Sequence, residues 1–258
     1  MRRKYFLFIW VYIALLLISE LLINYGKYVH AFIFTTLWVL IYVLILIKMK
    51  FDMKVDSNYS LLHMFYEYKK FLTVIIAVPV LMLIMLSFPF KGIYLYDLII
   101  VYSIFGAMTG VYLMNFRVHF LRIGHHFGGI RWLLPGLILT ALIAVINNKF
   151  LSSQTFEFDI FSLFFVVFSS YITVVYFYGL LQNFLRGFAN NFVAILYPAF
   201  VLSILAIPLG VLTVITTFLS ALLVSFIFFK SRNIILAFLL QSLLILMQYI
   251  LFPQYKLF

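Results

Sequence analysis

Residues 1–23 read MRRKYFLFIWVYIALLLISELLI, a basic start followed by an apolar run that decides the fold class. From Tyr5 to Ile23 the run contains one charged residue, Glu20. A helix needs about 20 such residues to cross a hydrocarbon core roughly 30 Å thick. Because no small-residue cleavage site follows, we interpret this run as a retained first transmembrane span rather than a cleaved signal peptide.

The rest of the chain repeats this pattern. Of its 258 residues 67% are hydrophobic and 10% are charged, with a mean hydropathy of +1.19, whereas globular domains are about 45–50% apolar and about 25% charged. Charged residues and Gly, Pro or Asn delimit nine apolar segments, at about 5–23, 30–47, 71–88, 94–114, 132–147, 160–182, 192–207, 209–229 and 233–252. The sequence therefore predicts one domain over residues 1–258, an all-α polytopic transmembrane bundle of eight or nine spans.

Two features of this pattern decide the topology. With a cytoplasmic N-terminus and nine spans, most of the 18 Lys and Arg residues fall on the inner side and only Lys27, Lys91, Lys149 and Lys256 fall outside. This bias favours that orientation. Segment 192–207 is short and carries Pro198, so it is either a full span or a broken or re-entrant helix.

Two connections predicted on the cytoplasmic side are long enough to have a function of their own. Residues 48–70 predict a cytoplasmic amphipathic helix, in which Leu61, Met64, Phe65 and Tyr68 follow helical spacing. The helix either lies on anionic headgroups or docks a cytosolic partner. Residues 115–131 contain three glycines and predict a flexible basic loop. Three of the five histidines fall in that loop, at His119, His125 and His126.

The sequence predicts no metal site, no cofactor site and no catalytic residue. His125 and His126 are adjacent and would point apart on a helix, the loop has no acid, and the chain has no Cys. Only two of the seven acids lie inside predicted spans, Glu20 and Asp97, and both fall towards the outer leaflet. They form either a structural contact or the site of an ion-coupled carrier.

Two stretches of the second half resemble a known family. Residues 174–183 read VVYFYGLLQN and residues 228–243 read FFKSRNIILAFLLQSL. The first resembles the Glu-Glu-x-x-x-Arg-Gly-Leu-Leu-Gln helix of the CPBP family, the CAAX-prenyl endopeptidases and bacteriocin-immunity-type proteins, and the second resembles its basic turn and following helix. The resemblance implies a CPBP-like core over residues 173–245.

The reactive groups of that family are absent from the aligned positions. Thr173 and Val174 stand at the two Glu positions, Tyr178 at the Arg, Gln241 at the His and Ile245 at the Asn. No base or metal ligand remains to activate a water molecule. The resemblance thus implies a pseudoenzyme, with Tyr178, Gln182 and Gln241 as candidate intramembrane polar or partner sites.

We therefore expect a non-catalytic multi-pass protein of a bacterial plasma membrane. Its function would be to bind and position another membrane or envelope protein, in contact with membrane lipids and without nucleic acid. The alternative is a permease subunit of a peptide or lipid exporter that a cytosolic ATPase energises. A carrier that uses Glu20 and Asp97 is a third hypothesis.

Overall fold

A computed structural model describes residues 2–52, 69–87, 95–115, 129–150, 160–207 and 211–251 of the chain. These residues form helices and contain no strand, which confirms the all-α prediction. In chain order the elements are α1 (Arg2–Asn24), α2 (Tyr28–Asp52), α4 (Ala77–Ser87), α5 (Leu95–Asn115), η2 (Ile130–Trp132), α6 (Leu133–Phe150), α7 (Ile160–Thr173), η3 (Val174–Gln182), α8 (Asn183–Phe188), α9 (Asn191–Leu205), α10 (Val211–Ser231) and α11 (Ile234–Leu251). Residues 69–75 are also helical and lead into α4 through a turn at Ile76.

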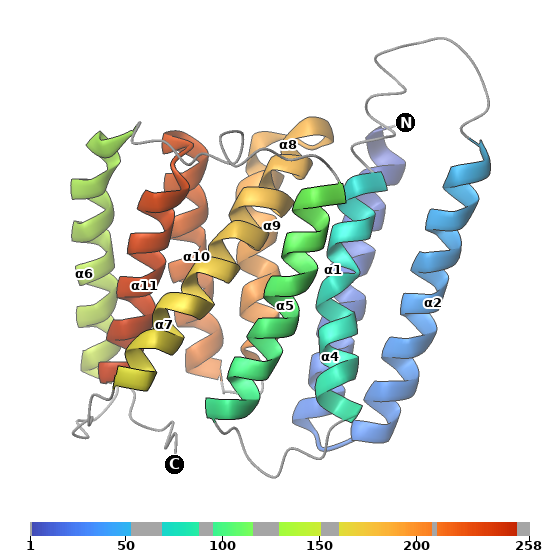
Figure 1. The fold of residues 1–258 in the computed structure, drawn as a ribbon, viewed down its shortest axis with the longest axis horizontal. Coiled ribbons are helices and arrows are strands. Elements are labelled where there is room, and N and C mark those ends of the chain that lie inside the picture. Colours follow the sequence, from blue (N-terminus) through green and yellow to red (C-terminus); the bar gives the residue numbers. More distant parts are fainter. Residues whose placement is uncertain are drawn as a thin grey trace.

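The helices stand side by side and alternate in direction along the chain (Figure 1). Helix α2 lies at one edge of the row and α6 at the other. The N-terminal helices pack in the order α2, α4 and α5, with α1 against α2, while α6, α7, α9, α10 and α11 form the second group. The two groups join where α1 contacts α9 and where α5 contacts α7.

Within the described ranges, three helices are long and apolar enough to cross a membrane. They are Tyr28–Lys48, Leu163–Gly187 and Thr213–Ser231, with mean hydropathies of 2.3, 1.9 and 1.9. Shorter apolar helices, such as Phe8–Asn24 and Asn191–Leu205, pack beside them. The chain is therefore compatible with a membrane protein.

Of the predicted segment 192–207, residues up to Leu205 form one continuous helix, α9, with Pro198 inside it. Helix α10 follows it in the opposite direction and packs along it (Figure 1). The break in a helix occurs elsewhere, at Ile76 within the predicted segment 71–88. The helix predicted at 160–182 is longer in the structure. It continues from α7 without interruption through η3 and α8 to Phe188.

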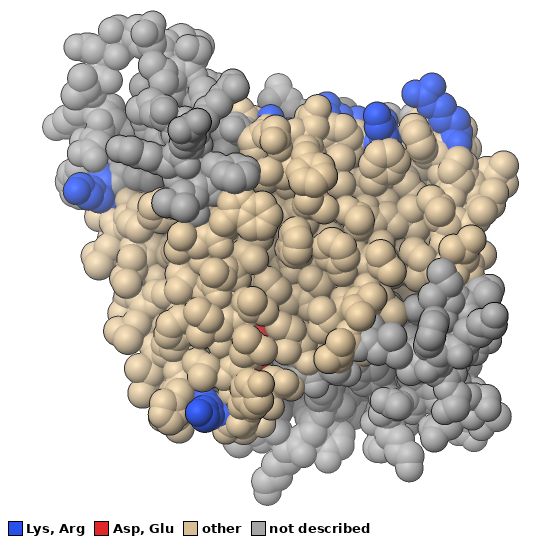
Figure 2. Space-filling model, turned by 180° about the vertical axis from the view of Figure 1, so that it is seen from behind, with Lys and Arg blue, Asp and Glu red and all other residues tan. Residues whose placement is uncertain are grey.

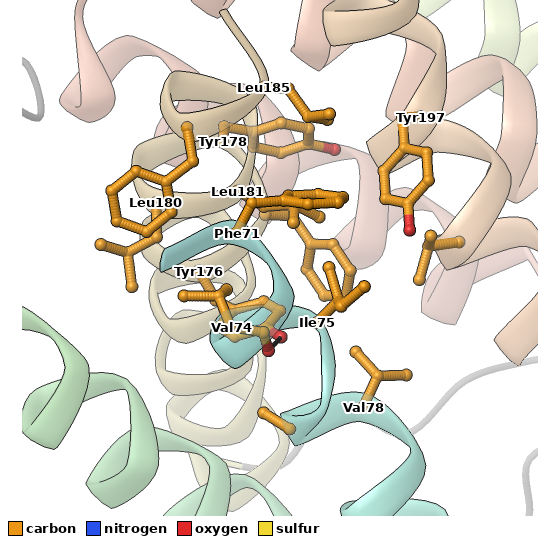
Figure 3. Packing of buried hydrophobic residues seen from close by; sticks show 14 of the residues in the cluster. Phe71, Val74, Ile75, Val78, Tyr176, Tyr178, Leu180, Leu181, Leu185 and Tyr197 are labelled. Atoms are coloured by element: carbon orange, nitrogen blue, oxygen red, sulfur yellow. Dashed lines mark hydrogen bonds between the residues drawn. The ribbon is translucent and has the colours of Figure 1, made fainter. Parts of the chain in front are cut away.

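The centre of the bundle is η3, which has the wider i→i+5 hydrogen bonding of a π-helix. All nine of its residues are buried. Figure 3 shows Tyr176 of η3 hydrogen-bonded to Val74 of the broken helix. Because η3 also contacts α9, α10 and α11, it is the element around which the second group of helices packs.

The basic side chains gather at one end of the bundle (Figure 2). Those with described positions at this end are Lys48, Lys69, Lys70, Arg131, Arg186, Lys230 and Arg232. Lys27 lies in the turn between α1 and α2, at the opposite end. The two ends of the bundle therefore differ strongly in charge among the described side chains.

Candidate functional site

Three contacts at regular spacing join the η3 and α8 region to α10. The Tyr178 hydroxyl donates to the Ala221 carbonyl at 3.4 Å. One turn further along, the Gln182 amide Nε2 donates to the carbonyl and the hydroxyl of Ser225, at 3.0 and 3.1 Å. The two helices run in the same direction here, so each step of four residues on one helix matches four on the other.

The third contact continues this register at the basic end. The Arg186 guanidinium lies over the Phe229 ring, with 4.1 Å between Cζ and the ring centroid. Such a contact between a cation and an aromatic face is stabilising, more so where water is excluded. We call these three contacts, made by Tyr178, Gln182 and Arg186, the α10 ladder.

Ser225 extends the α10 ladder to α9. Its hydroxyl donates to the Ile195 carbonyl at 2.8 Å while accepting from Gln182. Pro198 has no N–H to donate to the Ala194 carbonyl, so Ser225 bonds to the carbonyl next to the one that the proline leaves without its helical donor. One serine therefore links η3, α9 and α10.

The two predicted glutamines are both buried but are not brought together. Gln182 is fully buried, and its Oε1 has no hydrogen-bond partner in the part of the chain that the structure describes. Gln241 lies on α11, which contacts η3, and its Oε1 likewise lacks a described partner. No hydrogen bond joins Gln241 to Tyr178 or Gln182 among the described residues.

The positions that the CPBP resemblance aligns on reactive groups have structural contacts. Thr173 and Val174 are buried where α7 passes into η3. The Thr173 side chain shares a hydrogen bond with Tyr102 of α5. Together with the bond from Tyr178 to α10, this places side chains at two of the aligned positions in links between helices.

Sequence reasoning missed a cluster of three tyrosines at the helix break. The hydroxyls of Tyr112, Tyr176 and Tyr12 donate to the consecutive carbonyls of Thr73, Val74 and Ile75, and Figure 3 shows the bond from Tyr176. The bonds from Tyr112 and Tyr12 are 2.9 and 2.8 Å long.

The sequence signal for this cluster was Pro79. In a regular helix the Ile75 carbonyl would accept from residue 79, and proline has no N–H to donate. A proline four residues after a buried carbonyl therefore calls for a side-chain donor from another helix.

The two predicted intramembrane acids lie towards the same end of the bundle. Glu20 is buried on α1, about one turn from the end of that helix. Asp97 occupies the first turn of α5, and its side chain is outside the described part. Next to Glu20, the Ser19 hydroxyl accepts from Thr35 and Trp38 of α2 at 2.9 and 3.1 Å, which fastens α1 to α2.

Other predicted features lie outside the described residues. These are the docking-helix residues Leu61, Met64, Phe65 and Tyr68 and the histidines His119, His125 and His126. Among the side chains that are described, no group of three His, Cys, Asp or Glu residues could hold a metal ion.

Of the glycines spaced by four in α5, Gly106 packs tightly against Ile172 of α7. A methyl group added at Gly106 would come within 2.9 Å of the Ile172 side chain, whereas one at Gly110 would meet nothing within 4 Å.

No family model, curated protein or solved structure matches the chain. The candidate site is accordingly defined by its geometry: a buried π-helix that polar side chains join to α10 and to the broken helix, preceded by Thr173 of α7, which bonds to α5.

Proposed function

We propose that this chain is a non-catalytic scaffold of a bacterial plasma membrane, a degenerate CPBP-like protein that binds and positions another membrane or envelope protein. It crosses the membrane nine times, with its N-terminus and its basic end in the cytoplasm. The alternating direction of the helices supports repeated crossing of the membrane (Figure 1). The gathering of Lys and Arg at one end supports the orientation, because cytoplasmic connections typically carry an excess of these residues (Figure 2).

The observation that carries the scaffold role is the α10 ladder. A catalytic centre keeps its polar groups available to substrate or water. Here Tyr178 and Gln182 instead direct their hydrogens to α10, and Ser225 passes the link on to α9. Polar groups used in this way hold helices in a fixed arrangement, which suits a protein that presents a constant surface to a partner.

The orientation is tested by single-cysteine labelling, because the chain has no native Cys. Cysteine at the exposed position of Tyr25, between α1 and α2, is labelled from outside the cell by an impermeant maleimide. Cysteine at the exposed position of Asn190, between α8 and α9, is labelled only after the membrane is opened. The reverse pattern would contradict the proposed topology.

The scaffold role is tested by affinity purification in a mild detergent. Wild-type protein retains a membrane or envelope protein, and Gln182→Leu lowers that retention because it removes the link to Ser225. Lys27→Gln, at the end remote from the α10 ladder, is the matched control and leaves retention unchanged. A co-purifying ATPase would favour the exporter permease instead.

Hydrolysis provides the decisive contrary result. The purified chain leaves peptides and prenylated peptides uncut. Cleavage that disappears in both Tyr178→Phe and Gln241→Ala would show an active enzyme and would end the scaffold proposal.

A further inference from the structure

Four cations surround the turn between α10 and α11. Arg232 lies on the turn itself and Lys230 in the last turn of α10, while Arg186 of α8 packs on the Phe229 ring beside them. Arg131 approaches from η2, because the preceding Gly129 is packed against Ser231 so closely that an added methyl group would be 2.7 Å from the Ser231 Cβ. We call these four residues the turn cluster.

Unused hydrogen-bond donors accompany the turn cluster. The Arg186 Nη1 is shielded from solvent and has no hydrogen-bond partner among the described residues. The indole Nε1 of the neighbouring Trp132 is also shielded from solvent and has no hydrogen-bond partner among the described residues. The Trp132 ring packs edge-on against the Phe226 ring, with 6.0 Å between the centroids. Burying an N–H without an acceptor is unfavourable, so this region lacks acceptors rather than donors.

The cations are also held close to each other. Burial lowers the pKa of the Arg186 guanidinium, and the positive charge of the nearby Arg232 lowers it further, to about 10. Lys230 is fixed nearby over the Phe226 ring, with 5.8 Å between Nζ and the centroid. Like charges held together in this way favour a bound anion.

The backbone fixes Arg232 in an uncommon conformation. Its φ of 54° is in the left-handed region, which non-glycine residues rarely adopt. Hydrogen bonds on both sides hold it there: the Arg232 N–H donates to the Phe228 carbonyl at 2.8 Å, and Asn233 caps α11 by accepting from the Leu236 N–H at 3.1 Å. The turn therefore presents a cation at a set position.

We propose that the turn cluster binds the phosphate group of an anionic lipid, with the guanidinium groups of Arg186 and Arg232 as the principal donors. A guanidinium offers paired N–H groups that match two phosphate oxygens, and phosphate has acceptors but no competing donors when ionised. The choice of a lipid rests on the proposed function, which places this end of the bundle at the inner membrane surface. A headgroup at that depth is attached to acyl chains that cover the apolar helices below.

The test measures lipid retention by the purified full-length chain in detergent, using native mass spectrometry with phosphatidylglycerol and with phosphatidylcholine as the neutral-headgroup control. Arg186→Met keeps an apolar stem on Phe229 without the charge, and Arg232→Asn keeps a residue that tolerates positive φ. Each lowers phosphatidylglycerol affinity about tenfold. Lys48→Gln removes one cation from α2 at the same end and changes affinity less than twofold.

Further controls distinguish a lipid phosphate from free inorganic phosphate and provide a second variant in case Arg186→Met does not fold. Inorganic phosphate at a concentration equal to the lipid leaves the lipid bound; full displacement would overturn the lipid assignment. Arg186→Lys, which keeps the charge and loses the planar fork, gives an intermediate affinity and serves if Arg186→Met does not fold. An equal loss in Lys48→Gln would overturn the site in favour of general surface charge.

This result is independent of the partner experiment, because it uses the purified chain alone. Lipid retention without any co-purifying protein would leave the turn cluster supported and the scaffold role contradicted. If the wild-type chain retains a partner protein but Arg186→Met, Arg186→Lys and Arg232→Asn leave lipid affinity unchanged, the scaffold role is supported and the turn cluster is contradicted as a lipid site.

Discussion

Pro79 and Pro198 each follow a run of described helix, and the two helices respond to the proline differently. The described helix over residues 69–75 breaks at Ile76, three residues before Pro79. Helix α9 continues past Pro198 as a single element. At the break three tyrosine hydroxyls from three other helices reach consecutive carbonyls, whereas in α9 the serine hydroxyl of Ser225 reaches the Ile195 carbonyl.

The comparison shows that a proline does not by itself break a helix in this chain. Inside a bilayer a free carbonyl has no water to bond to, so a broken turn persists only where other helices supply donors. Tyr12, Tyr112 and Tyr176 provide those donors around residues 73–75, and they come from α1, α5 and η3. The break is therefore also a junction between the two groups of helices.

The largest expected effect comes from removing two of these donors. Tyr12→Phe combined with Tyr176→Phe keeps both rings and leaves the carbonyls of Val74 and Ile75 without their hydroxyls. We expect the free energy of unfolding to fall by about 3 kcal/mol, as two buried acceptors become unsatisfied. Chemical unfolding in mixed micelles measures it. Tyr28→Phe, at an exposed position, is the control, and an equal loss there would contradict the argument.

A second variant asks whether Pro79 is the cause of the break. In Pro79→Ala the new N–H can bond to the Ile75 carbonyl, so the hydroxyl of Tyr12 becomes less necessary. We expect Tyr12→Phe to cost about 1 kcal/mol less in the Pro79→Ala background than in wild type. A double-mutant cycle on the same unfolding assay measures this coupling. Strictly additive effects would mean that the break does not depend on the proline.

The existence of the helices could be read from the sequence, because long apolar runs leave few alternatives to helix. The residues at which the helices end were harder to predict from the sequence. Helix continues from the run at 160–182 into Arg186, since a cation at a helix end can rest on an aromatic ring such as that of Phe229. Pro79 and Pro198 both lie within apolar runs, so the sequence did not indicate which of the two helices would break.

For the candidate site, the sequence named Tyr178, Gln182 and Gln241 as candidate intramembrane polar or partner sites, and that role stays a prediction. In the structure all three side chains are buried. Their partners could not be predicted, because Ala221 and Ser225 are 43 residues away from Tyr178 and Gln182 in the chain. Tyr12, Tyr112 and Tyr176 were missed because tyrosine is common in this sequence and also suits membrane interfaces.

A smaller effect is expected from the donor beside Pro198. Ser225→Ala removes the bond to the Ile195 carbonyl, while Gln182 can still donate to the carbonyl of residue 225. We expect a loss of about 0.6 kcal/mol in the free energy of unfolding, typical of interhelical hydrogen bonds in membranes. The same micelle assay measures it, with Ser220→Ala as control, because Ser220 lies on the same helix and its hydroxyl has no hydrogen-bond partner among the described residues. A loss as large as that from Tyr176→Phe would remove the contrast between the two prolines.

The smallest effect is expected at the first contact of the α10 ladder. The hydroxyl of Tyr178 lies 3.4 Å from the Ala221 carbonyl, which is long for an O–H donor and therefore weak. Tyr178→Phe keeps the ring against Phe228 and should lower the free energy of unfolding by less than about 0.5 kcal/mol. Tyr176→Phe, two residues away in the same π-helix, is the matched comparison and should lower it more. If the two variants lose equal stability, the carbonyls at the helix break have no greater need of a donor than the intact α10.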